Sequence, residues 1–104
     1  IFARDAGTRV IDVLINCSPV GMSPKINESP FLARDFKKSM VVFDSVYNPM
    51  ETRLLREAKA AGCTVIHGSE LFINQAARQF ELWTGQPAPI EIMRDVLLEK
   101  LATL

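Results

Sequence analysis

Two side chains in this sequence carry polar groups suited to holding a small polar molecule. Tyr47 lies in the segment 44–49 (DSVYNP), directly after a short apolar run. Its phenol can donate a hydrogen bond to a carboxylate or hydroxyl of a small acid while its ring packs. The amide of Gln75 can both donate and accept, which suits a ring with several hydroxyl groups. Position alone leaves both roles open, because Tyr47 could be a loop-capping aromatic and Gln75 an ordinary glutamine at the border of a helix.

The aspartate, histidine and cysteine side chains considered next are less suited to a catalytic or binding role. Asp44 follows a predicted strand, where an aspartate more often caps nearby backbone N–H groups than acts as an acid, so we predict a structural role. His67 is the only histidine and has no carboxylate or cysteine beside it in the sequence, so we assign it no role. Cys17 and Cys63 lie far apart without a CxxC motif. We expect them to be reduced, half-buried structural thiols of a cytosolic protein, and we predict no metal site.

Three apolar runs predict the strands that position these residues. They cover residues 10–16 (VIDVLIN), 40–43 (MVVF) and 63–67 (CTVIH). The run 40–43 lacks alternation, which is typical of a strand buried on both faces of a parallel sheet. A helix is expected over 53–61, stopped by Gly62, so the second and third strands form a parallel βαβ unit. Their carboxyl ends then share one edge, where open α/β sheets bind ligands.

Two more helices are expected after the third strand, at about 70–83 and 90–101. The first helix should bury a stripe formed by Phe72, Ala76, Phe80 and Trp83. The second should bury a stripe formed by Ile90, Met93, Val96, Leu97 and Leu101. Gln75 and Gln79 are four residues apart and share a face. Residues 21–38 predict a crossover loop with one short helical turn around 30–36, and residues 1–9 a loop or helix end.

Composition limits the classes of function. With 104 residues and 48% hydrophobic content, we expect a single compact unit with one modest core. The net charge is zero, so there is no basic footprint for nucleic acid and no polybasic surface for a membrane. No apolar run approaches the roughly 18 residues of a spanning helix. The chain begins at Ile1 without methionine, and we expect it to be a piece of a longer protein.

Three segments together resemble the C-terminal part of shikimate dehydrogenases. Residues 16–22 (NCSPVGM) are similar to that family's Asn-Ala-Thr-Pro-x-Gly-Met signature. Residues 44–55 combine a strand-end Asp, a Tyr three positions on, a Pro two beyond it and a Thr-x-Leu-Leu helix start. Residues 68–76 (GSELFINQA) place a helical Gln seven residues after a strand-end Gly. The three segments occur in the family's order and spacing, from about Val10 to Leu98.

This resemblance implies a fold and an activity. The fold would be α/β, half of a Rossmann-like NADP-binding domain with about three parallel strands and flanking helices, and residues 1–104 would be its C-terminal half. The activity would be that of a cytoplasmic oxidoreductase of the shikimate pathway, which supplies aromatic amino-acid biosynthesis. Such enzymes move a hydride between NADP and the C3 position of 3-dehydroshikimate or shikimate.

The resemblance also implies site residues. Tyr47 and Gln75, and less firmly Gln79, would contact the substrate. The expected cofactor-binding residues are Asn16 and Ser18 near the adenosine half, and Ser45, Gly68 and Leu71 near the nicotinamide. Residue type alone leaves alternatives, because Gly68 could be a simple turn glycine and Asn16 a strand-end turn residue.

The remaining parts of such an enzyme have no match in this chain. The family's catalytic Lys and Asp lie in a separate N-terminal domain, so no residue here is predicted to be catalytic. The Gly-rich phosphate loop and the basic residues that grip the 2′-phosphate precede the first matching segment. We therefore expect the isolated chain to be inactive and its partners to be the rest of the parent chain and a small-molecule substrate. An exposed sheet edge would also allow self-association.

Other interpretations are a quinate/shikimate dehydrogenase that uses NAD, a non-catalytic module that senses quinate or shikimate, and a folding fragment without activity. The motif at 16–22 and the turn at 87–89 (PAP) are also similar to bifunctional forms fused to a 3-dehydroquinate dehydratase. A sensing module would keep Tyr47 and Gln75 but would not need the upstream Lys and Asp.

Overall fold

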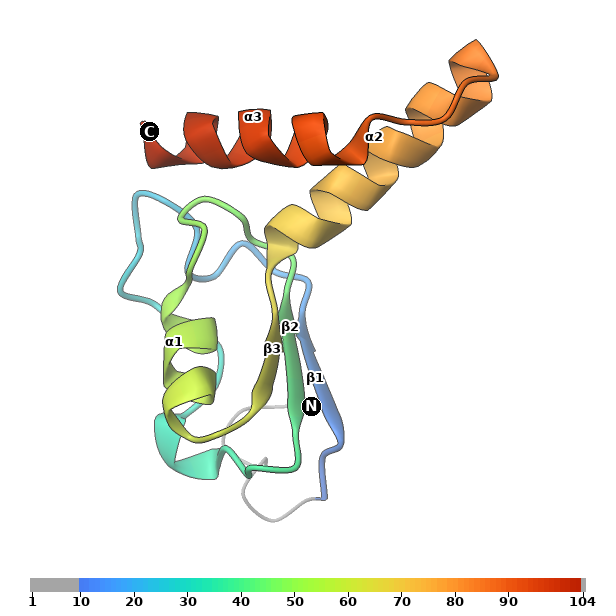
Figure 1. Ribbon diagram of the computed structural model, residues 1–104. Helices are drawn as coiled ribbons and strands as arrows, with labels where there is room; N and C mark the ends of the chain where they lie inside the picture. The colour runs from blue at the N-terminus through green and yellow to red at the C-terminus, as the bar shows by residue number, and fades with distance from the viewer. Residues whose placement is uncertain (1–9, 104) are drawn as a thin grey trace. The chain divides into compact units, whose positions relative to one another are not determined.

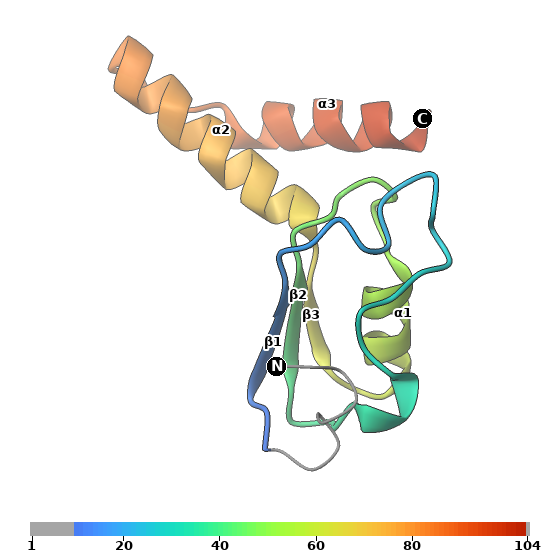
Figure 2. The same ribbon diagram turned by 180° about the vertical axis from the view of Figure 1, so that it is seen from behind.

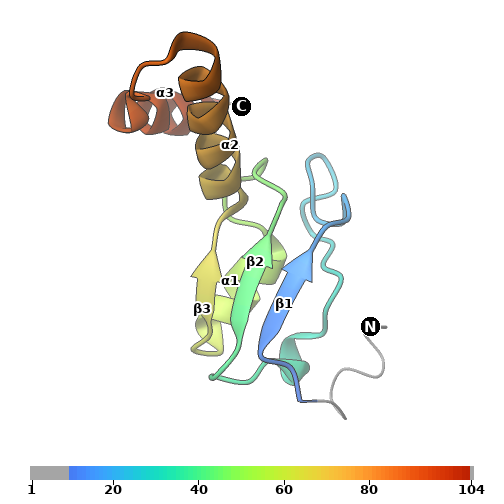
Figure 3. The ribbon, with the colours of Figure 1, turned by 90° about the vertical axis from the view of Figure 1, so that its right-hand side faces the viewer.

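The computed structural model describes residues 10–103, and its first part is built on a small parallel sheet. The strands are β1 (Val13–Asn16), β2 (Val41–Asp44) and β3 (Thr64–Ile66). They lie in the order β1-β2-β3, all parallel (Figure 3). Asn16 is the partner of Asp44, and Phe43 that of Ile66, so the carboxyl ends lie together. The prediction of about three parallel strands in an α/β fold is confirmed.

Helix α1 (Arg53–Ala60) connects β2 to β3 and lies on one face of the sheet (Figures 1 and 2). It begins where the side chain of Thr52 accepts a hydrogen bond from the backbone N–H of Leu55. It ends before Gly62, whose φ of +88° is a conformation that glycine adopts at little cost. The predicted βαβ unit and its glycine stop are therefore present.

The core lies between α1 and the sheet. Leu14, Val42 and Val65 are in register across the three strands and pack on the α1 side. The buried core residues are Phe31, Phe36, Met40, Val42, Leu54, Leu55, Ala58 and Cys63. The predicted helical turn in the crossover is the short 3₁₀ helix η2 (Ala33–Asp35), between Phe31 and Phe36.

The opposite face of the sheet is apolar but open. Val13, Ile15 and Ile66 are 56%, 53% and 41% exposed, and Val41 and Phe43 are half-buried. The prediction that the strand at 40–43 is buried on both faces is therefore wrong for this chain. The physical reason is that α1 covers only one face, while side chains alternate between the two.

Two further helices form the second part of the chain. They are α2 (Gly68–Thr84) and α3 (Ile90–Ala102), close to the predicted ranges. The chain divides into two compact units, residues 1–68 and 69–104, so the expectation of a single unit is wrong. Trp83 and Val96 are 80% and 61% exposed, against their predicted core positions, because two helices bury only the faces where they meet.

Residues 1–9, expected to form a loop or helix end, lie outside the described residues. Within residues 10–103, no helix is both long and apolar enough to span a bilayer.

Candidate functional site

Five of the predicted site residues lie in the first unit, at or next to the carboxyl edge of the sheet. Asn16 ends β1, and Ser18 follows it in the next loop. Ser45 and Tyr47 are in the loop that follows β2, and Gly68 comes two residues after the end of β3. The parallel register brings these three chain segments to one edge. The sequence predicted this for the segments after β2 and β3, and for the segment after β1 if β1 joined the sheet in parallel.

The side chain of Asn16 joins the two loops. It is 5% exposed, and its Oδ1 accepts hydrogen bonds from the backbone N–H and the hydroxyl of Ser18, at 3.1 and 2.6 Å. Its Nδ2 donates to the carbonyl of Val20 and to Oδ1 of Asp44, both at 3.1 Å. The hydroxyl of Ser45 donates to the Asn16 carbonyl at 2.8 Å. This pattern matches the strand-end turn alternative for Asn16, and its contact with a cofactor stays a prediction.

The carboxylate of Asp44 is fully buried beneath this edge. Its Oδ1 accepts from the N–H of Val46 at 3.0 Å, and its Oδ2 accepts from the hydroxyl of Thr52 at 2.7 Å. Together with the Asn16 amide, these donors satisfy both oxygens without a cation. The predicted structural role of Asp44 is confirmed. Its bond to Asn16, 28 residues earlier, has no sequence signal that we identified.

Tyr47 is held at the surface by the residues around it. Val46 is 6% exposed and anchors the loop inward, and the carbonyl of Asn48 accepts a hydrogen bond from the N–H of Ser23 at 2.8 Å. Tyr47 itself is 37% exposed. With its backbone anchored at the rim of the sheet edge, the phenolic hydroxyl of Tyr47 is suited to donate a hydrogen bond to a bound polar molecule.

Gly68 packs against the loop that follows β2. A Cβ at this position would lie 2.6 Å from the carbonyl oxygen of Val46, and 2.7 Å from those of Asp44 and Ser45. Glycine is thus required by close approach of the chain's own backbone, a reason that involves neither a turn with positive φ nor a cofactor. The nicotinamide contact of Gly68 stays a prediction.

A pocket of about 250 Å³ lies beside the end of β1. Its polar lining comes from Asn16 and Ser18, and the rest is formed by Leu14, Ile15, Cys17, Pro30 and Phe31. Two of the predicted cofactor-binding residues therefore border a hollow with both polar and apolar walls, which is the kind of surface that a nucleoside needs.

The other predicted site residues lie on α2, in the second unit. Leu71, Gln75 and Gln79 follow one another at intervals of four, so they share one face, and all three are exposed. The structure therefore places the predicted site residues in two sets, one in each unit.

An ion pair that the sequence analysis missed joins α2 to α3. Both carboxylate oxygens of Glu70 bind the guanidinium of Arg94, at 3.1 and 3.2 Å. These hydrogen bonds raise the pKa of Arg94 above its ordinary value. Glu70 also lies in the first turn of α2, as predicted, where it complements the helix dipole. Glu70 and Arg94 are 24 residues apart in the chain, so no local sequence pattern indicated that they would pair.

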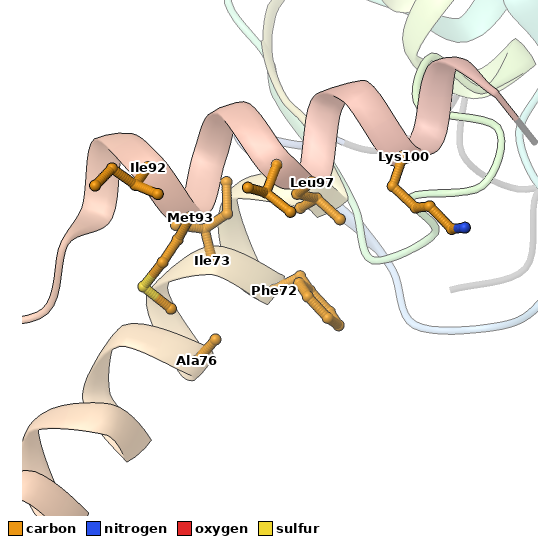
Figure 4. A pocket seen from close by; sticks show the side chains of 8 residues that line it. Phe72, Ile73, Ala76, Ile92, Met93, Leu97 and Lys100 are labelled. Carbon is orange, nitrogen blue, oxygen red and sulfur yellow. The ribbon is translucent and has the colours of Figure 1, made fainter.

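The two helices also line an open apolar pocket of about 400 Å³ (Figure 4). Ile73 of α2 and Met93 of α3 lie between the helices, and Lys100 is at one end. The full lining is Phe72, Ile73, Ala76, Ile92, Met93, Val96, Leu97 and Lys100. None of the predicted site residues of α2 lines it, so it is separate from the predicted chemistry.

The two cysteines differ in exposure, which corrects the expectation that both are half-buried. Cys17 is exposed, whereas Cys63 is 8% exposed and its Sγ lies 3.1 Å from the carbonyl of Lys37. Burial raises the pKa of the Cys63 thiol. Cys17 follows a buried strand end but points outward, and Cys63 fills the core beneath α1.

We predict that a thiol reagent labels the two cysteines at very different rates at neutral pH. Cys17 should react within minutes, and Cys63 only after denaturation, because it is buried and its raised pKa reduces the thiolate fraction. Cys17→Ser should remove the fast phase, as measured by mass spectrometry of the labelled protein. Rapid labelling of Cys63 in the folded protein would contradict this assignment.

Comparison with known proteins shows which family this chain is similar to. Residues 68–98 match the family model described as the shikimate 5'-dehydrogenase C-terminal domain. A shikimate dehydrogenase (NADP(+)) from Maridesulfovibrio salexigens is 46% identical over 96 residues. The chain is similar to the C-terminal part of shikimate dehydrogenases. That match covers 91% of this chain but 35% of the M. salexigens shikimate dehydrogenase, so the chain spans about a third of the length of this relative.

Solved structures agree with this family likeness. A shikimate dehydrogenase in complex with NADP+ is 41% identical, with a TM-score of 0.82 over 86% of this chain and 32% of its own. The Thermus thermophilus enzyme, in complex with NADP(H) and shikimate, is 34% identical with a TM-score of 0.78, over 91% and 35%. A quinate dehydrogenase from Corynebacterium glutamicum, in complex with NAD, is 36% identical with a TM-score of 0.79, over 85% and 31%.

Proposed function

We propose that this chain is part of an NADP-dependent shikimate dehydrogenase, which reduces 3-dehydroshikimate to shikimate. The single observation that carries the proposal is the 46% identity to an NADP-dependent shikimate dehydrogenase over 91% of the chain. The geometry supports it, because Tyr47, Ser45, Ser18 and Asn16 gather at the carboxyl edge of a parallel sheet, where such folds bind dinucleotides.

The residues present fit one side of a dinucleotide site. The mixed pocket beside Asn16 and Ser18 suits the nucleoside portion, and the close packing of Gly68 on the β2 loop keeps side-chain bulk away from this edge. When bound, NADPH supplies the hydride in a reaction of this class. Residues of this chain bind and orient, and no side chain here is proposed to be the general acid or base.

The substrate contribution of this chain is proposed to come from Tyr47 and from the amides of Gln75 and Gln79. The phenol of Tyr47 would donate to the substrate carboxylate or a hydroxyl, and the amides would pair with ring hydroxyl groups. Shikimate is the ligand named for the T. thermophilus relative, which supports a small polyhydroxylated acid as the substrate.

The rest of a parent chain is the proposed main partner. Val13, Ile15 and Ile66 leave an apolar sheet face open among the described residues, and β1 is an edge strand with a free side. Parallel sheets are normally covered on both faces. Without such cover, self-association through the face or the β1 edge is the expected alternative, and the isolated chain should be inactive.

We predict that Tyr47→Phe weakens substrate binding in the complete protein that contains this chain. Removing one hydrogen bond to a charged or polar ligand costs about 1.5 kcal/mol, or roughly tenfold in KM for shikimate. The kcat should change less, because the phenol binds without transferring a proton. The measurement is nicotinamide absorbance during shikimate oxidation, with NADP and separately with NAD.

Thr64→Val is the matched control for this experiment. It removes a hydroxyl from an exposed residue at the opposite, amino end of β3, so KM should stay within about twofold of wild type. If Tyr47→Phe and Thr64→Val give the same KM, Tyr47 is outside the substrate site. If shikimate binds but neither cofactor supports turnover, a sensing module replaces the enzyme as the better proposal.

An NAD-dependent quinate/shikimate dehydrogenase is the second candidate. The likeness to the C. glutamicum quinate dehydrogenase, at 36% identity and a TM-score of 0.79, favours keeping it. The same assay separates the candidates, since a higher kcat/KM for quinate with NAD than for shikimate with NADP would select it.

A further inference from the structure

Two loops at the carboxyl edge carry different proposed tasks. The loop that follows β1 carries Ser18 and begins at Asn16, both proposed to lie on the cofactor side. The loop that follows β2 carries Tyr47, proposed to lie on the substrate side, and Ser45, expected near the nicotinamide. A productive complex requires the two ligands at a set distance from each other, so something must hold these loops in register.

The Asp44 carboxylate lies where the two loops and α1 meet. Its Oδ1 accepts from the Asn16 amide of the first loop at 3.1 Å and from the Val46 N–H of the second loop at 3.0 Å. Its Oδ2 accepts from the hydroxyl of Thr52, which in turn caps α1 at the N–H of Leu55. Asp44 is 0% exposed, so these bonds are shielded from water.

Tyr47 lies next to one of these donors. Val46 is 6% exposed and is fixed by its N–H bond to the carboxylate, and Tyr47 is the next residue. In the loop that follows β1, Asn16 also fixes Ser18, because the N–H and the hydroxyl of Ser18 both donate to Asn16 Oδ1. One carboxylate therefore sits two bonded steps from Tyr47 and from Ser18.

We propose that Asp44 is a positioning residue that sets the loop carrying Tyr47 relative to the loop carrying Asn16 and Ser18. It touches neither ligand and acts through Asn16 and Val46. This inference rests on the proposed function for its kinetic consequences, whereas its effect on the two loops does not depend on that function.

The test compares three variants of the complete protein. Asp44→Ala removes both acceptors, and Asp44→Asn keeps a neutral acceptor of the same shape. Thr52→Val is the matched control, because it breaks the bond to Oδ2 and the helix cap but leaves the Asn16–Asp44 bond. Thermal stability, KM for shikimate, the dissociation constant for NADP, and kcat are measured for each.

A positioning role predicts that binding of both ligands weakens together. Asp44→Ala should raise KM and the NADP dissociation constant by roughly tenfold each. It should also lower kcat, because ligands held at the wrong distance from each other react more slowly. Asp44→Asn should restore only part of this loss and leave both constants clearly above those of Thr52→Val, so it remains informative if the alanine variant does not fold. Thr52→Val should lower thermal stability while both constants stay within about twofold. If Thr52→Val and Asp44→Asn change KM and the NADP dissociation constant to the same extent, the proposal is overturned.

Hydrogen exchange separates this inference from the proposed function. In Asp44→Asn, amides of residues 18–23 and 45–48 should both exchange several-fold faster than in wild type, whether or not the protein oxidises shikimate. In Thr52→Val, faster exchange should be confined to the first turn of α1. Faster exchange in 45–48 alone would overturn the proposal, while absent turnover in the wild type with both loops responding would reject only the proposed function.

Discussion

Gly68→Ala is expected to destabilise the protein by about 3 kcal/mol or more, as a Cβ there has no space. It would lie 2.6 to 2.7 Å from three backbone carbonyl oxygens, those of Val46, Asp44 and Ser45. Backbone oxygens cannot turn aside as the tip of a side chain can. Alanine would otherwise favour the first turn of α2 by up to about 1 kcal/mol over glycine, so the clash must exceed this gain.

Gly85→Ala provides the control for this prediction. Gly85 has a φ of +67°, and a Cβ there would meet nothing within 4 Å, so alanine suffers only the backbone strain of about 1 kcal/mol. Urea denaturation followed by circular dichroism measures both variants. A loss of stability for Gly68→Ala no larger than that for Gly85→Ala would show that the β2 loop yields easily. It would also remove close packing as the reason for glycine at this position.

Leu55→Ala is expected to cost about 3 kcal/mol, because it empties space in a closed core. Leu55 is 0% exposed and packs with Leu54 and Ala58 in the core under α1. The same residue donates its N–H to the Thr52 cap, whose hydroxyl holds the Asp44 carboxylate. Leu55→Ala keeps this backbone N–H, so KM for shikimate should stay close to that of wild type while stability falls.

Leu82→Ala deletes the same atoms at a position that is 67% exposed. It should change the free energy of unfolding by less than about 0.5 kcal/mol, since little apolar surface is removed from a packed environment. Urea denaturation of both variants gives the comparison. Similar values for Leu55→Ala and Leu82→Ala would mean that the core between α1 and the sheet can collapse around the missing side chain.

Local patterns in the sequence predicted the helices and strands and the edge of the sheet at which polar residues lie. Apolar runs of four to seven residues predicted three strands, and the structure has strands of four, four and three residues within those runs or one residue beyond. Gly62 predicted the end of α1 because the φ of +88° that follows the helix suits glycine. The βαβ connection then placed Ser45 and Tyr47 at the edge where the second and third strands end. Ser18 was expected there only if the first strand joined the sheet in parallel, which the structure shows.

Burial was harder to predict than element type. The apolar run at 40–43 predicts two covered faces, yet cover depends on which segments pack there. Among the described residues, α1 and the crossover residues Phe31 and Phe36 form a core on one face. Trp83 and Val96 follow helical periodicity but are exposed, because periodicity shows which residues share a face and says nothing of what lies opposite.

The sequence by itself therefore determined the α/β class, the order of the elements and the edge where polar residues gather. These follow from short-range periodicity and from the handedness of βαβ connections. Only the tertiary structure decided that Asp44 bonds Asn16 across 28 residues, that Glu70 pairs with Arg94, and that Gly68 packs on the β2 loop. Such contacts join residues distant in the chain, and their geometry depends on the packing of whole elements rather than on the residues beside them.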